Sequence, residues 1–93
     1  MTEQFCKCFR LLSFKEAAQQ LADEVIEFIG QPSLDELSDC SFAVGRLLGA
    51  VRGCLYVGMP FDGRHWIKIR SRMKTHGCIR SKRHLEWARC PSE

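Results

Sequence analysis

The sequence lacks several features, and each absence excludes a class of protein. No apolar run approaches the roughly 20 residues that a helix needs to cross a bilayer, and no apolar signal-peptide core follows Met1. The chain has no internal repeat and no low-complexity segment, which excludes a solenoid. It has no glycine-rich phosphate loop and no nucleophile paired with a base, which excludes the common phosphate-loop and catalytic-triad enzymes. We therefore expect a cytoplasmic protein that is neither a membrane span nor a secreted precursor.

The chain is also too short for two independent folds. It has 93 residues, and its 45% apolar and 27% charged residues match the usual balance of a globular domain. We therefore predict one folded domain over residues 1–93.

The cysteines follow no CxxC spacing, and without a secretory signal we expect free thiols instead of a disulfide framework. Cys40 and Cys54 fall at half-apolar positions of a predicted helix, where we expect them to pack as small apolar residues. The remaining zinc-type ligands gather near the carboxyl end, but their spacing matches no standard zinc site. These residues are His76, Cys78, His84 and Cys90, while Cys6 and Cys8 lie near the amino end.

The net charge of +3 conceals a strong division along the chain. Residues 1–40 hold three Lys/Arg and eight Asp/Glu, a net −5, whereas residues 41–93 hold eleven Lys/Arg and three Asp/Glu, a net +8. Such asymmetry is typical of a basic nucleic-acid-binding segment, or of acid-bound cations and basic side chains that share one anionic ligand.

The helix signals predict an all-α fold built on an antiparallel hairpin. Ser13-x-x-Glu16 is a capping box before an apolar face that runs to Ile29, and Gly30 is expected to end this helix as a left-handed cap. Ser33-x-x-Glu36 is a second capping box, and its helix runs to about Gly53. Two helices joined by so short a turn must lie antiparallel.

Weaker signals complete the predicted fold. Gly45 and Gly49 each weaken the second helix by about 1 kcal/mol, and they permit either a close contact with another helix or a kink. An apolar connection follows, then a third helix from about Arg64 to Thr75 with Asp62 as its cap, and a short fourth helix from Ser81 through Trp87. The fold is thus a hairpin plus one or two shorter helices, a bundle that we expect oligomerisation to complete.

The hairpin brings two pairs of acidic residues towards each other. Glu24 and Glu27 lie one turn apart on the first helix, and Glu36 and Asp39 lie one turn apart on the second. Converging carboxylates repel one another unless a hard cation such as Mg²⁺ lies between them. The alternative is an ordinary acidic helix face exposed to solvent, in which Glu36 acts only as the third residue of the capping box.

These residues carry a resemblance to a known family. Asp23-Glu24-Val25-Ile26-Glu27, followed by Glu36-Leu37-Ser38-Asp39 and an apolar helix, resembles the E-E-x-x-E and E-x-x-D motifs of MazG-like, all-α nucleoside triphosphate pyrophosphohydrolases. The resemblance covers residues 14–75, leaves a basic segment at 76–93, and is nearest to the small phage-encoded members, whose location would be the host cytoplasm.

The resemblance implies a site, a cofactor and an assembly. Glu24, Glu27, Glu36 and Asp39 would be the catalytic and metal-ligating residues, holding Mg²⁺ or Mn²⁺ for cleavage of a nucleoside triphosphate to monophosphate and pyrophosphate. It also implies a homo-oligomer, a dimer or a tetramer. In this hypothesis we expect Asp23, beside the ligands, to orient a water molecule. The gap at residues 28–35 is shorter than the family shows, so the alternative is a non-catalytic interaction protein that binds a host protein.

The basic half supplies candidate partners for phosphate. Arg64, Lys68 and Arg72 recur every four residues along the predicted third helix, and Lys and Arg bind phosphate oxygens. We expect these three to contact the substrate phosphates. The same stripe, with Trp66 and Trp87 nearby, is the alternative surface for nucleic acid.

Overall fold

The computed structural model describes residues 6–80, which form three α-helices and no strand. They are α1 (Phe14–Gly30), α2 (Leu34–Arg52) and α3 (Gly63–His76). The predicted all-α class is therefore confirmed, while the predicted fourth helix lies outside the described residues. No described helix is both long enough and apolar enough to cross a membrane.

The described residues divide into two compact units. One unit is formed by residues 11–65, which include α1, α2 and the first turn of α3. The other is formed by residues 6–10 together with 66–80. The acidic pairs lie in the first unit, so its local structure determines the geometry of the candidate site.

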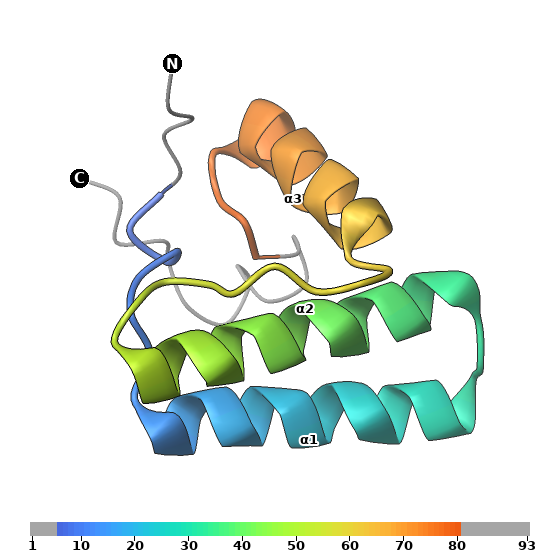
Figure 1. Cartoon of the computed structure of the whole chain (residues 1–93). Helices are drawn as coiled ribbons and strands as arrows, with labels where there is room; N and C mark the ends of the chain where they lie inside the picture. Colours follow the sequence, from blue (N-terminus) through green and yellow to red (C-terminus); the bar gives the residue numbers. More distant parts are fainter. Residues whose placement is uncertain (1–5, 81–93) are drawn as a thin grey trace. The chain divides into compact units, whose positions relative to one another are not determined.

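Helices α1 and α2 lie side by side and antiparallel, as predicted (Figure 1). The capping box of α1 is complete, because the Glu16 amide donates to Ser13 Oγ and the Ser13 amide donates to Glu16 Oε1, both at 3.1 Å. At the start of α2 the Glu36 amide donates to Ser33 Oγ at 3.1 Å. The caps fix both helix starts, and hence the register of the acidic residues.

The helix ends differ in part from the prediction. Among the described glycines only Gly53 and Gly77 have positive φ, at 84° and 71°. Gly53 closes α2 as a left-handed cap, whereas Gly30 is an ordinary last residue of α1, and the left-handed cap predicted there is wrong. Gln31 ends α1 instead, with its amide bonded to Glu27 O and its backbone outside the helical region, at φ −150° and ψ 79°.

The two glycines of α2 allow a loop to lie against the helix backbone. The segment after α2 runs back along that helix (Figure 1), and the Val57 amide donates to Gly45 O at 3.0 Å. A Cβ on Gly45 would lie 2.5 Å from Val57 O, and a Cβ on Gly49 would lie 2.6 Å from Cys54 O. The two glycines were predicted to permit either a close contact with another helix or a kink. The close contact that the structure shows is with this loop.

Helix α2 is the central element of this unit, because α1 packs against one face and the loop after α2 packs against another. Phe42 and Ala43 are buried, and the Phe42 ring stacks on Tyr56 and His65 at centroid distances of 4.9 and 4.1 Å. The same helix buries polar side chains, namely Ser38, Asp39 and Arg46.

The packing role predicted for Cys54 is wrong. Its side chain is exposed because α2 ends at Arg52, two residues before it. Cys40, by contrast, is half-buried within α2, and its Sγ donates to Glu24 O at 3.3 Å. No disulfide joins any of the described cysteines.

Candidate metal centre of the helical hairpin

The hairpin brings three of the four predicted carboxylates into one cluster. Glu24 and Glu27 come from α1, and Glu36 comes from the first turn of α2. One carboxylate oxygen from each residue lies within 4.8 Å of the other two. Three oxygen donors at this separation form a donor set of the kind that a hard divalent cation prefers.

Asp39 lies beside this acidic cluster and also contacts a histidine. Its Oδ1 is 2.6 Å from His65 Nδ1, and both residues are only 9% exposed. The charge of Asp39 raises the pKa of Glu24, so Asp39 is close enough to act on the cluster electrostatically. The imidazole, stacked on Phe42, fixes the orientation of the Asp39 carboxylate.

Burial and mutual repulsion disfavour full ionisation of the cluster. Burial raises the pKa of Glu24 from 4.5 to about 8, helped by a hydrogen bond with Glu27 and by the charges of Asp39, Glu27 and Glu36. Glu24 Oε1 is buried and has no hydrogen-bond partner among the described residues. A divalent cation would both coordinate such an oxygen and cancel the repulsion, so the residues present fit Mg²⁺.

The thiol of Cys40 shares this environment. Burial raises its pKa, as do the charges of Glu24, Asp39, Glu36 and Glu27. Cys40 therefore stays protonated at neutral pH and gives the cluster a neutral neighbour, not a soft thiolate ligand.

Two interactions around the cluster had no signal in the sequence. The His65 amide in the first turn of α3 donates to Ser38 Oγ at 2.9 Å, so a side chain of α2 satisfies the amide that a cap would bind. Asp62, the predicted cap, instead accepts hydrogen bonds from Tyr56 Oη and the Met59 amide. His65 itself was missed because it has no ligand-type neighbour at a recognisable spacing.

The predicted phosphate-binding residues have varied surroundings. Arg64 belongs to the hairpin unit and forms an exposed ion pair with Asp35, with Nη1 and Oδ1 3.2 Å apart. Lys68 and Arg72 belong to the other unit, where Arg72 Nη1 donates to Ile79 O at 3.0 Å. Asp23, which was predicted to orient a water molecule, is exposed and accepts a hydrogen bond from Gln19.

Comparison with protein-family models, with curated proteins and with solved structures finds no match. The functional argument therefore rests on the residues of this chain and on their geometry.

Proposed function

We propose that this protein is a Mg²⁺-dependent nucleotide pyrophosphohydrolase, which cleaves a nucleoside triphosphate between its α and β phosphates. The observation that carries the proposal is the convergence of Glu24, Glu27 and Glu36 from two antiparallel helices. The motif resemblance to MazG-like enzymes supports the choice of reaction, because these three residues and Asp39 are the ones that match the ligand positions of that family.

The electrostatics of the cluster support a cation more strongly than a solvated face. A solvated face would leave its carboxylates ionised and hydrated, whereas Glu24 has a pKa near 8 and a buried, unsatisfied oxygen. In this proposal Glu24, Glu27 and Glu36 hold the cation, with Asp39 kept in place by His65. When bound, Mg²⁺ or Mn²⁺ would lower the pKa of a water molecule and neutralise charge on the phosphates.

Arg64, which lies in the same unit as the carboxylates, adds a phosphate contact to the proposal. It would hold a phosphate oxygen by exchanging its ion pair with Asp35. That ion pair is exposed, so its loss has a small energetic cost.

Pyrophosphate release from a panel of standard and modified nucleoside triphosphates, with Mg²⁺ or Mn²⁺, tests this function. We expect activity in the natural chain and a loss of roughly a hundredfold in Glu27→Gln, which removes one charge from the cluster at an exposed position. Glu16→Gln is the matched control, because it makes the same change on the same helix and keeps the capping box.

Thermal unfolding in a Mg²⁺ titration provides a second measurement. The cation should raise the melting temperature of the natural chain and of Glu16→Gln, but not that of Glu27→Gln. Absence of pyrophosphate with every nucleotide, together with a melting temperature that does not respond to Mg²⁺, would overturn the proposal. That result would favour a non-catalytic interaction protein.

The proposal includes a homo-oligomer. The hairpin exposes large apolar side chains on both helices. More than 60% of each of four residues is exposed, namely Phe14, Ile26, Ile29 and Val51. Such surface on a small domain is typical of an interface between copies. We expect light scattering at micromolar concentration to give the mass of a dimer or a tetramer, and a monomer mass at every concentration would contradict this part.

A further inference from the structure

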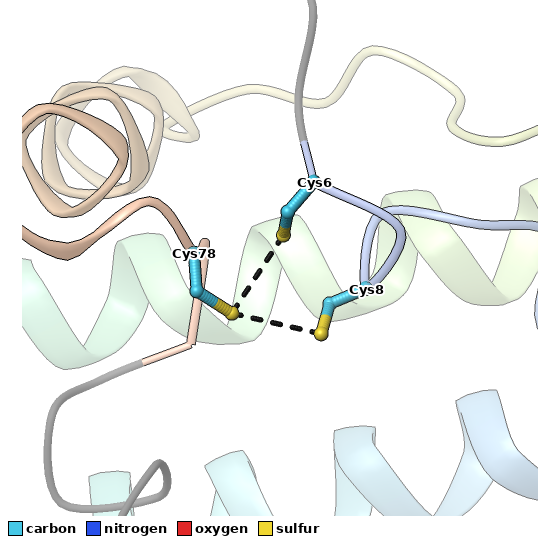
Figure 2. Close-up of side chains that lie close together, drawn as sticks. All are labelled: Cys6, Cys8 and Cys78. Atoms are coloured by element: carbon cyan, nitrogen blue, oxygen red, sulfur yellow. Dashed lines mark hydrogen bonds between the residues drawn. The ribbon is translucent and has the colours of Figure 1, made fainter. Parts of the chain in front are cut away.

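Three cysteines from opposite ends of the described chain meet in the unit formed by residues 6–10 and 66–80. Figure 2 shows the sulfur of Cys78 directed at those of Cys6 and Cys8, and the Sγ–Sγ distance is 3.6 Å in each case. All three sulfurs lie within 4.8 Å of one another. Cys78 is fully buried and Cys6 is 6% exposed, so the group forms part of the interior of this unit.

Local backbone structure directs these sulfurs together. The Phe9 amide donates to Cys6 O at 3.0 Å, which closes a turn that carries both Cys6 and Cys8. At the other end Gly77 adopts φ 71° after α3, and its amide donates to Met73 O, so the chain turns sharply just before Cys78.

Two backbone amides donate to the sulfurs. The Ile79 amide donates to Cys6 Sγ and the Arg80 amide donates to Cys78 Sγ, both at 3.4 Å. Residues 6–10 and 66–80 contain seven Lys/Arg and no Asp/Glu. Amide donors stabilise metal-bound thiolates, and two segments without carboxylates do not supply the ligands that Mg²⁺ prefers.

We propose that Cys6, Cys8 and Cys78 form a zinc site. Thiolate ligands about 2.3 Å from a tetrahedral zinc ion lie about 3.8 Å from one another, close to the observed 3.6 Å. Three thiolates and one Zn²⁺ carry a net charge of −1, which the positive net charge of these two segments offsets. A water molecule would complete the fourth position.

A zinc ion at this site would stabilise the folded unit. It would join two segments separated by 70 residues or more, and the unit has a small core formed by Ile69, Cys78, Ile79 and Cys6. A zinc ion that binds the folded chain and not the unfolded chain stabilises the fold by mass action. The site would therefore add stability to a unit with a small core.

Metal analysis of the full chain tests this site. The protein is expressed with zinc, purified under reducing conditions without a chelator, and its zinc content is measured by mass spectrometry. We expect one zinc per chain, at least a tenfold loss of zinc in Cys8→Ser and in Cys78→Ser, and no loss in the exposed control Cys54→Ser. Glu27→Gln should also retain the zinc, which separates this site from the acidic cluster.

Cobalt substitution gives a second readout, which tests the natural chain directly. Co²⁺ in the natural chain should show a thiolate-to-cobalt charge-transfer band and the intense visible bands of a tetrahedral ion, and the half-buried Cys8→Ser should weaken both. Reduced natural protein that shows neither zinc nor the thiolate band would overturn the proposal. A disulfide between Cys78 and Cys6 or Cys8 in the zinc-supplied protein would overturn it as well.

Discussion

Gly49→Ala should destabilise the protein by roughly 3 kcal/mol, although alanine is the better helix former by about 1 kcal/mol. The added Cβ would lie 2.6 Å from Cys54 O and 2.9 Å from the Tyr56 amide nitrogen. Both are backbone atoms of a segment held against α2, so neither moves without loss of the Val57–Gly45 hydrogen bond and of the Phe42–Tyr56 stack. Urea unfolding followed by circular dichroism measures the change.

Gly30→Ala is the matched control for this prediction. Gly30 is also helical, but nothing lies within 4 Å of a Cβ added there, and we expect a neutral effect or a gain of up to about 1 kcal/mol. Equal effects of the two substitutions would show that the loop does not lie against α2 as described. Gly45→Ala should resemble Gly49→Ala, because its Cβ would meet Val57 O at 2.5 Å.

Stability in the absence of divalent metal should fall as the pH rises from about 5 to about 8. The folded-state pKa of Glu24 is about 8 and its ordinary value is 4.5, so between these values the folded chain binds a proton that the unfolded chain releases. This contribution is complete below the ordinary pKa and is lost as the pH rises through 8. Water screens the half-buried carboxyl, so we expect a change of roughly 2 kcal/mol.

The variants isolate this effect from other titrating groups. Glu24→Gln should flatten the dependence of the unfolding free energy on pH, and saturating Mg²⁺ should do the same in the natural chain. Glu16→Gln should keep the slope, because Glu16 lies in the capping box away from the cluster. An identical slope in Glu24→Gln and in the natural chain would show that the carboxylates are not coupled.

Local signals in the sequence predicted most of the helical hairpin. The capping serines, Ser13 and Ser33, act within three residues of the chain, so their effect is visible in the sequence itself. The turn between α1 and α2 is short enough to require antiparallel helices, and helical spacing then placed Glu24, Glu27 and Glu36 near one gap. That expectation needed only periodicity and one turn.

The remaining features depend on contacts between distant residues. His65 and Asp39 are 26 residues apart, and no periodic pattern links a histidine in α3 to the acidic turn of α2. The meeting of Cys78 with Cys6 and Cys8 spans 70 residues or more, and no local spacing in the sequence links these positions. Gly30 shows the opposite error, since its place at a helix end favoured a left-handed cap, whereas Gly30 is helical and Gln31, with φ −150° and ψ 79°, ends the helix.

The contacts of His65 give one stretch of α2 two roles. Glu36 belongs to the acidic cluster, while Ser38 and Asp39, within one helical turn of it, bind the amide and the ring of His65 at the start of α3. The helix geometry fixes the spacing between these three residues. A substitution that distorts this stretch of α2 would therefore disturb the carboxylates and the start of α3 together.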